Sequence, residues 1–350
     1  SEGRCTSHVR KAVTQMNAGK KRLLMPLRLF LCSLMLMSVA QAEDPLPSWA
    51  DTSPKQAILD FVAKVSVPNG KDFVPEQDRL AVFDNDGTLW PECPMPFQIA
   101  FVIDEVKRLA AEQPELAKDP MVKAALEGDF KALFAGEKHD GFMKIMALTH
   151  SGMSSDEFSR RVQSWFSKAE YPPLGTSYGE ATYQPMQEVI SLLRSKGFQV
   201  AIVSGGGVDF MRQFSEDVYG VSPEWVLGSS ADVVFKLQDD VPTFVKQASN
   251  LYINDKVGKS VRIYQQLGRR PIACFGNSDG DQSMLEYTTI DNPYKSLGVI
   301  IHHTDGQREC EYDSKPPFSG KLITALEEAP KRRWVVVDMK QDWEAVFSGQ

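Results

Sequence analysis

Three groups of polar residues stand directly behind apolar runs that have the composition of buried strands. They are DNDGT at 84–88, SGGG at 204–207 and GNSDGD at 276–281. Ligands of parallel sheets bind beyond the carboxyl ends of the strands, so we expect the three groups to converge on one spot. Carboxylates gathered there repel one another unless a cation is present, and carboxylate, amide and carbonyl oxygens suit Mg²⁺.

The residue types at this edge suit phosphoryl transfer. Asp84 is placed to attack phosphorus and form an aspartyl phosphate that water then hydrolyses. Asp86 is placed to protonate the leaving oxygen and later to deprotonate the attacking water. The Ser204 hydroxyl, the glycine-rich turn that opens the next helix and the point charge of Lys259 would hold the phosphate.

The elements that must position these residues alternate between strand and helix. Short apolar runs bounded by turn residues are typical of strands buried on both faces, and they lie at 79–84, 198–204, 271–276 and 297–303. Helical patterns separate them at 186–197, 208–220, 259–268 and 281–288. This alternation predicts an α/β fold with a doubly wound parallel sheet.

The first two strands are separated by far more residues than a crossover loop needs. This stretch has helical patterns between Pro and Gly breaks. We therefore predict an α/β core from residues 43–92 and 183–350, with a helical cap subdomain inserted at 93–182. The run 225–246 has strand-forming residues on both sides of a QDD turn, and we predict a hairpin excursion from the same sheet.

The order and spacing of D-x-D-G-T-L, S-G-G, a downstream lysine and G-N-S-D-G-D resemble the motifs of haloacid dehalogenase-like (HAD) phosphatases. The S-G-G turn and a helical insert straight after the first motif are most similar to the phosphoserine phosphatase-like branch. The resemblance spans about residues 79–303 and implies a Rossmann-like core with a C1-type helical cap.

The resemblance implies a set of site residues. Its catalytic pair is Asp84 as nucleophile and Asp86 as acid/base. The implied phosphate-binding residues are Thr88, Ser204, Gly205, Gly206 and Lys259, and the implied Mg²⁺ ligands are Asp84, Asp86, Asn277 and Asp281. Glu92 stands near where related phosphatases place a glutamate that reads the substrate.

The chain departs from the family pattern in its last motif, where Asn277 replaces the usual first aspartate. An amide oxygen still ligates Mg²⁺ but carries no charge, so Asp281 or Asp279 is expected to supply the second carboxylate. Lys256 competes with Lys259 for the lysine role. We favour Lys259 because it begins the helical pattern directly.

These observations predict an exported, Mg²⁺-dependent phosphatase that hydrolyses a small phosphomonoester through a phospho-aspartate. Dehalogenating relatives lack an acid/base aspartate two residues after the nucleophile, whereas this chain has Asp86. A phosphotransferase that uses the same intermediate, or a non-catalytic phosphate-ligand binding protein of the same fold, remains an alternative. Phosphoserine, phosphocholine, sugar phosphates and nucleoside monophosphates all stay open as substrates.

The other patterns in the sequence do not indicate a further ligand site. The GKS at 258–260 lacks the glycine of a P-loop, since Ile253 stands there, and SGGG lacks the third glycine of a dinucleotide motif, since Phe210 stands there. His302 and His303 have no metal-ligand spacing and are taken as structural. The apolar residues of the insert are expected to form its core, with some at the substrate mouth; they include Phe142, Met143, Met146, Trp165 and Phe166.

The N-terminal segment 1–42 has the layout of a secretory signal. A basic stretch precedes the apolar run 29–39 and a small-x-small ending at Ala42, so we predict cleavage there and a periplasmic or secreted protein. The run is shorter than the roughly 20 residues of a membrane span, so no stable anchor is expected after cleavage. Met25 is a candidate for the true start.

The net charge limits the class of ligand, and the cysteine content limits the possible disulfides. A net charge of −7 gives no long-range attraction to nucleic acid, so the expected partner is a small phosphorylated metabolite held by a local site. The predicted mature chain keeps Cys93, Cys274 and Cys310, which permits one disulfide with a spare thiol or three thiols. The oligomeric state is left open.

Overall fold

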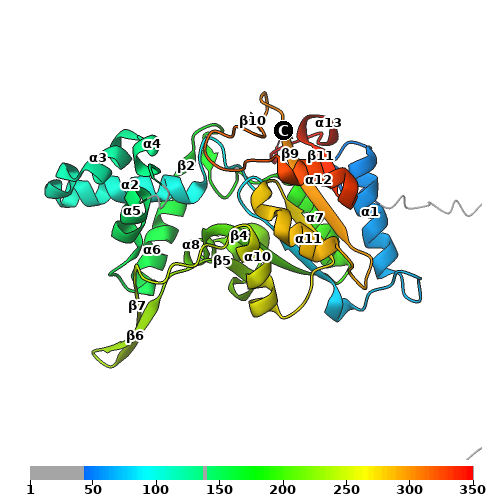
Figure 1. Ribbon diagram of the computed structural model, residues 1–350, viewed down its shortest axis with the longest axis horizontal. Coiled ribbons are helices and arrows are strands. Elements are labelled where there is room, and N and C mark those ends of the chain that lie inside the picture. Colours follow the sequence, from blue (N-terminus) through cyan, green and yellow to red (C-terminus); the bar gives the residue numbers. More distant parts are fainter. Residues whose placement is uncertain (1–42, 137–139, 350) are drawn as a thin grey trace, which may run out of the picture. The chain divides into compact units, whose positions relative to one another are not determined.

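The structure is a computed structural model, and it describes residues 43–136 and 140–349. The predicted signal segment lies outside the described residues. The main sheet consists of β1 (Leu80–Phe83), β4 (Gln199–Gly207), β5 (Val226–Ser229), β8 (Ala273–Gly276), β9 (Leu297–Thr304), β10 (Glu311–Tyr312) and β11 (Val335–Asp338). Its strands follow the order β10-β9-β8-β1-β4-β5, and β11 also pairs with β9 (Figure 1).

All pairs within this sheet are parallel except β9 with β10. The prediction of an α/β fold with a doubly wound parallel sheet is therefore confirmed. The central strand β1 lies between β4 and β8, with Val82 opposite Ala201 on one side and Cys274 on the other. The three predicted motif strands are thus immediate neighbours, which is why their polar ends meet.

Alternating residues of each strand enter two separate apolar cores, as the pleat of a strand requires. Ala81 and Phe83 of β1 face one core, which α1 (Ser53–Ser66) and α7 (Gln184–Ser195) complete. Leu80 and Val82 face the other core, which is completed by residues of α11 (Gln282–Thr289) and α12 (Thr324–Arg332). Burial on both faces explains the near-continuous apolar runs of these strands.

Shorter helices lie between the strands or after the last one. They are α8 (Val208–Met211), α9 (Ser215–Tyr219), α10 (Val257–Arg262) and α13 (Met339–Asp342). The single turns are Glu76–Asp78, Pro114–Lys118, Pro223–Trp225 and Asp279–Asp281, which are 3₁₀, and Ile263–Leu267, which is π-helical.

Five helices fall inside the predicted cap range: α2 (Phe97–Glu112), α3 (Pro120–Glu127), α4 (Phe130–Leu133), α5 (Asp140–His150) and α6 (Ser155–Phe166). A small hairpin of β2 (Glu170–Tyr171) and β3 (Thr176–Ser177) follows them. Local signals set the boundaries, since Asp119 caps the start of α3, Gly128 ends it in the left-handed conformation, and Ser154 caps α6. The division into core and cap stays a prediction.

The predicted hairpin excursion is present, since β5 belongs to the main sheet and the chain then leaves it. Strands β6 (Val233–Gln238) and β7 (Val241–Lys246) form a two-stranded sheet of their own, separate from β5. The base of β7 instead joins the loop between α5 and α6, where the Lys246 carbonyl accepts from the Gly152 N–H and the Lys246 N–H donates to the Met153 carbonyl.

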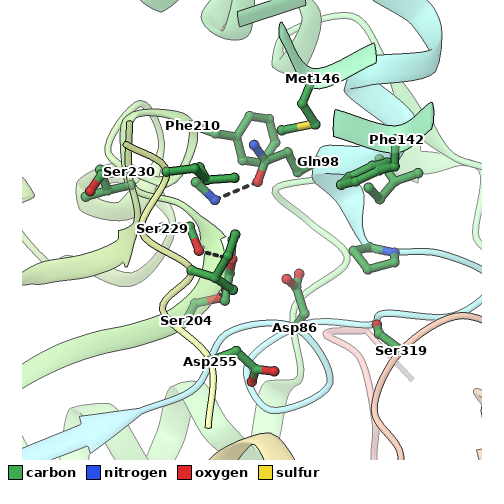
Figure 2. A pocket seen from close by; sticks show the side chains of 18 of the residues that line it. Asp86, Gln98, Phe142, Met146, Ser204, Phe210, Ser229, Ser230, Asp255 and Ser319 are labelled. Carbon is green, nitrogen blue, oxygen red and sulfur yellow. Dashed lines mark hydrogen bonds between the residues drawn. The ribbon is translucent and has the colours of Figure 1, made fainter. Parts of the chain in front are cut away.

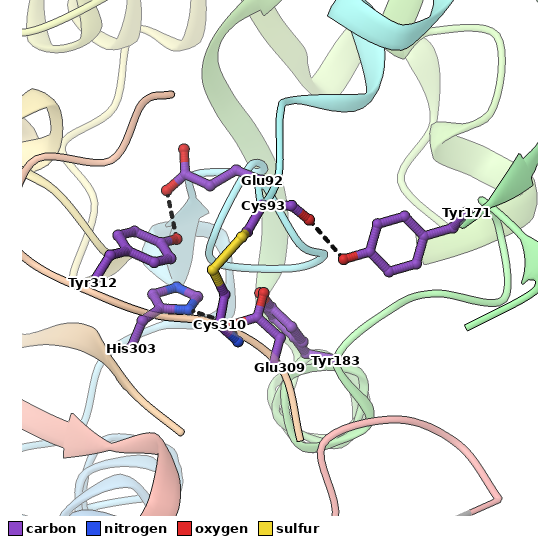
Figure 3. Close-up of a disulfide and its surroundings, with 8 residues drawn as sticks. All are labelled: Glu92, Cys93, Tyr171, Tyr183, His303, Glu309, Cys310 and Tyr312. Atoms are coloured by element: carbon purple, nitrogen blue, oxygen red, sulfur yellow. Dashed lines mark hydrogen bonds and ion pairs between the residues drawn. A yellow bond between two sulfur atoms is a disulfide. The ribbon is translucent and has the colours of Figure 1, made fainter. Parts of the chain in front are cut away.

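The structure pairs Cys93 with Cys310 in a disulfide that joins residues 217 positions apart, and Cys274 is a buried free thiol (Figure 3). This outcome decides between the two alternatives that the sequence left open. Within residues 43–136 and 140–349, no helix has both the length and the apolar character needed to cross a bilayer.

Candidate active site

The carboxyl ends of β1, β4 and β8 open into one cavity of about 740 Å³ (Figure 2). Seven of the predicted site residues line it, and these are Asp84, Asp86, Glu92, Ser204, Gly205, Gly206 and Lys259. Thr88, Asn277 and Asp281 are buried and are connected to the lining residues by hydrogen bonds. The structure therefore brings the whole predicted set together.

A buried lysine joins two of the motifs. The Lys259 ammonium group donates to Asp84 Oδ1 at 2.7 Å and to Asp281 Oδ1 at 2.5 Å, and the lysine is only 2% exposed. Burial lowers the pKa of Lys259, but the charges of Asp281 and Asp84 outweigh this effect and raise it. Burial raises the pKa of Asp84 well above its ordinary value, Asp281 raises it further, and Lys259 opposes both.

The same contacts distinguish Lys259 from Lys256 and Asp281 from Asp279, the two choices that the sequence left open. Lys259 lies inside the cluster, whereas Lys256 is exposed at the start of α10. Asp279 Oδ1 accepts from the Ile323 and Ala325 N–H groups and so supports the start of α12. Asp281 Oδ2 accepts from the backbone of residues 277 and 278, so both of its oxygens have protein partners. The geometry gives Asp281 the task of positioning Lys259, and its role as a metal ligand stays a prediction.

Asp86 is held by a tryptophan of the loop that follows β1. The Trp90 indole N–H donates to Asp86 Oδ1 at 2.7 Å, and burial raises the pKa of Asp86 to about 6 although this hydrogen bond opposes the shift. Gly87 permits the turn because its φ is +78° and a Cβ there would lie 2.2 Å from Asn277 Nδ2. The D-x-D-G order therefore reflects a tight approach of two motifs.

Asn277 and Glu92 form the wall beside this turn. The Asn277 amide N–H donates to Glu92 Oε1 at 2.7 Å, and its Oδ1 accepts from the Thr88 hydroxyl at 3.2 Å. Glu92 also accepts from the hydroxyls of Tyr312 and Ser319. Burial raises the pKa of Glu92 to about 7, against the hydrogen bond from Ser319. Glu92 lines the cavity, but both of its oxygens already have protein partners.

The glycine-rich segment differs from the prediction. Residues 204–207 continue β4 with a register shift against β5, and α8 behind them has only four residues. The expected long helix and its dipole are therefore absent at this point, because the helical pattern is divided between α8 and α9. The Ser204 hydroxyl accepts from the Gly206 N–H at 3.1 Å, and the Asn254 amide N–H donates to the Ser204 carbonyl.

Several residues that support the site were not found from the sequence. His303 is 2% exposed, and its two ring nitrogens face the Gly87 carbonyl at 2.8 Å and Glu309 Oε2 at 2.9 Å (Figure 3). Burial lowers the pKa of His303, but Glu309 outweighs it and the net shift is upward. Period-two alternation along β9 places His303 on the face of Ile301, but no signal in the sequence identified Gly87 as its partner.

Two further lining residues were also missed. Asp255 lies in the cavity near Asp86 (Figure 2), one position before the lysine that was weighed. Gln98 Oε1 accepts from the Gly207 N–H at 2.7 Å and so connects α2 to the end of β4. Both belong to short polar stretches without a recognisable motif.

The donor set suits a hard cation. Among the described residues, no group of three or more His, Cys, Asp or Glu side chains is arranged to hold a metal ion. Asp84, Asp86 and the amide oxygen of Asn277 nevertheless offer oxygen ligands of the kind that Mg²⁺ prefers. Four carboxylates, including those of Glu92 and Asp281, stand against the single ammonium group of Lys259, so the cluster favours an added positive charge.

The parallel sheet and the acid–lysine cluster at its carboxyl edge define an α/β enzyme with a strand-end active site. The sequence profile of haloacid dehalogenase-like hydrolases matches residues 81–286, more than half of the chain. The chain belongs to this hydrolase family. No curated protein matches it.

Solved structures with a similar fold include a conserved protein of unknown function from Anaerococcus prevotii, with 17% identity and a TM-score of 0.47 over 72% of this chain and 86% of that one. A protein of unknown function from Bordetella pertussis has 16% identity and a TM-score of 0.45 over 75% of this chain and 98% of that one. A phosphoserine phosphohydrolase-like protein from Francisella tularensis has 15% identity and a TM-score of 0.36, over 66% and 89% of the two chains.

Proposed function

We propose that the protein is an exported, Mg²⁺-dependent phosphatase that hydrolyses a small phosphomonoester through a phospho-aspartate on Asp84. The observation that carries this proposal is the contact between Asp84 and the buried Lys259, with Asp86 and Ser204 in the same cavity. A site that only binds phosphate has no need of a carboxylate nucleophile beside a separate acid/base residue.

In the first step an oxygen of Asp84 attacks phosphorus, and the bond from phosphorus to the substrate alcohol breaks. Lys259 holds Asp84 Oδ1, which leaves the second oxygen available for attack. Asp86 donates its proton to the leaving oxygen. A pKa of about 6 suits this task, because the group exchanges protons readily near neutral pH.

In the second step water attacks the phosphorus of the phospho-aspartate. Asp86, now deprotonated, takes a proton from this water, the bond from phosphorus to Asp84 breaks, and inorganic phosphate is released. Ser204, the glycines after it and Lys259 would hold the phosphate oxygens through both steps. Mg²⁺, which Asp84, Asp86 and Asn277 would bind, neutralises phosphate charge when present.

Export is supported by two features. The predicted signal occupies residues 1–42, and a disulfide between Cys93 and Cys310 is typical of proteins that function in oxidising compartments. Mass spectrometry of the protein recovered from the periplasm of an expressing bacterium tests this part. A chain that begins at Glu43 is the expected result, and an uncleaved chain kept in the cytoplasm would contradict it.

The decisive experiment measures phosphate release by the full chain from a panel of small phosphomonoesters, with Mg²⁺ and with a chelator. We expect release that needs Mg²⁺ and that falls by about 10⁴-fold or more in Asp84→Asn, because the amide cannot act as the nucleophile. Asp60→Asn, the same change on an exposed residue of α1, is the matched control and should keep full activity.

The outcomes separate the alternatives. Full activity in Asp84→Asn would overturn the mechanism. Turnover that depends on Asp84 but transfers phosphate to an added alcohol would indicate a phosphotransferase. Phosphonate binding without turnover of any ester would indicate a binding protein.

A further inference from the structure

The cavity is much larger than a phosphate group needs, and its two ends differ in chemistry. Figure 2 shows Asp86 and Ser204 at one end and Phe142, Met146 and Phe210 at the other. A volume of about 740 Å³ lies within the range of pockets that enclose a drug-sized ligand. The end away from Asp84 is therefore the place for the alcohol part of the substrate.

The walls of this apolar end come from the helical insert and α8. Its side chains are Ile99 of α2, Phe142, Met143 and Met146 of α5, Phe158 of α6 and Phe210 of α8. Phe158 and Phe210 are buried, so they form its floor, whereas Phe142 and Met146 are partly exposed toward the cavity. Flexible methionines adapt to irregular apolar ligands.

The polar groups at this end are hydrogen-bonded to one another. Gln98 accepts from the Gly207 N–H, and its amide N–H lies 3.2 Å from His150 Nε2. His150 Nδ1 lies 2.8 Å from the Thr149 hydroxyl. A neutral imidazole satisfies both contacts, with Nε2 as acceptor and Nδ1–H as donor.

The charges near this end also cancel. Lys246 forms an ion pair with Asp209 and lies 4.6 Å above the ring of Phe158. Lys256, Lys259 and Lys321 also line the cavity. They belong to segments of the charged end, since Lys259 contacts Asp84, the Lys256 N–H donates to the Gly280 carbonyl, and Lys321 comes two residues after Ser319, which donates to Glu92. A carboxylate or ammonium on the substrate would thus lose its water at the apolar end without gaining an unpaired charge from the side chains described there.

We propose that the substrate is the phosphate ester of an uncharged, bulky apolar alcohol, aromatic or branched-alkyl, whose hydrocarbon part fills the end lined by Phe142, Met146 and Phe210. This inference rests on the proposed phosphatase function. It excludes phosphoserine and phosphocholine as the preferred substrates, because both place a charge on the leaving alcohol.

The test compares kcat/KM of the full chain for 2-phenylethyl phosphate, phosphoserine, phosphocholine and methyl phosphate. We expect 2-phenylethyl phosphate to be preferred over both charged esters by about 10-fold or more, the gain from burying an aromatic group. Met146→Gln should lower kcat/KM for this ester by about 10-fold and leave that for methyl phosphate unchanged. Met121→Gln makes the same change in α3 outside the cavity, and it should alter neither.

A preference for phosphoserine or phosphocholine would overturn the inference and leave the phosphatase intact. An equal loss for all esters in Met146→Gln would also overturn it. If no ester is hydrolysed, the proposed phosphatase function is wrong. The binding of phosphonates then tests whether the apolar end prefers an uncharged ligand. By calorimetry, 3-phenylpropylphosphonate should then bind about 10-fold or more tighter than 2-amino-4-phosphonobutyrate. Equal or weaker binding would contradict it.

Discussion

The two ends of the cavity are built by different means. At the charged end, Asp84 directly follows β1 and Ser204 lies in β4, which is hydrogen-bonded to β1. Lys259 and Asp281 belong to short segments next to the sheet, and Lys259 contacts both Asp84 and Asp281. At the apolar end, Phe142 and Met146 come from one helix of a long insert and are positioned by side-chain packing.

We therefore expect the charged end to carry out the reaction and the apolar end to set the substrate selectivity. A strand ladder fixes its end residues against the neighbouring strands, so the reacting groups keep a defined geometry. Packed helices tolerate exchange of one apolar side chain for another of similar size, so the opposite wall can change without moving the cluster. Burying the charged groups at the charged end costs free energy, whereas burying the apolar side chains stabilises the other end.

The largest expected effect comes from removing the only ammonium group of the cluster. Lys259→Met leaves Asp84 and Asp281 buried without their cation, so we expect the free energy of unfolding to fall by about 3–5 kcal/mol. Denaturant titration by circular dichroism measures this change.

The matched control is Lys64→Met, which breaks an exposed ion pair with Asp60. We expect a change of about 0.5 kcal/mol or less there, because solvent screens such pairs. Equal losses in the two variants would show that Lys259 does not stabilise the buried carboxylates of the charged end.

The next effect concerns the proton that Asp86 supplies. In Asp86→Asn, we expect kcat for alkyl phosphates to fall by about 10²-fold or more, because a poor leaving group needs the acid. The first-turnover release of nitrophenolate from 4-nitrophenyl phosphate should fall much less, since this group leaves without a proton. Rapid-mixing absorbance measures the burst, and equal losses for both esters would assign Asp86 another role.

The smallest effect tests whether the apolar end rejects charge. Burial, and to a smaller extent the positive charge of Lys246, lower the pKa of His150 to about 3. Between this value and the ordinary 6.5, the unfolded chain binds more protons than the folded one, so stability rises with pH and is lost as pH falls below about 6.5. We expect the His150 contribution to be a loss on the order of 1–2 kcal/mol between pH 7 and pH 5. Asp86 and Glu92 contribute with the opposite sign in the same range, because their raised pKa values make the folded chain bind more protons.

Urea titrations of the parent chain and of His150→Gln at the two pH values isolate this contribution, because the other groups titrate alike in both chains. His150→Gln keeps an acceptor for Gln98 but cannot titrate, so on going from pH 7 to pH 5 the variant should gain about 1–2 kcal/mol of stability relative to the parent chain. His302→Gln retains His150 and should follow the parent chain. An unchanged pH dependence in His150→Gln would show that this end accommodates a protonated imidazole.

Much of the charged end could be predicted from local patterns. Apolar runs followed by polar groups identified β1, β4 and β8. Strands buried on both faces are apolar, whereas the residues at their carboxyl ends face a binding site and are polar. The same reasoning took 205–207 for a turn and 208–220 for one helix. Periodicity does not show that a strand continues through glycines, or that a helix is divided into α8 and α9.

The choice between two residues close together in the sequence could be made only from the three-dimensional structure. Lys259 and Asp84 are 175 positions apart, and a helical turn decides that Lys259 rather than Lys256 reaches the carboxylate. The contact of Asp279 with the start of α12 is likewise invisible in its motif. The pairing of Cys93 with Cys310 depends on how β10 returns toward the segment after β1.

The sequence by itself determined the fold class and the residues that we propose for phosphoryl chemistry, because strand periodicity and carboxylate spacing are local properties. Only the tertiary structure decided which residues touch and which apolar side chains face a cavity. Phe142 and Met146 show the reason: an apolar residue at helical spacing has the same pattern whether it packs in a core or lines a pocket, and only the three-dimensional arrangement of its neighbours separates the two.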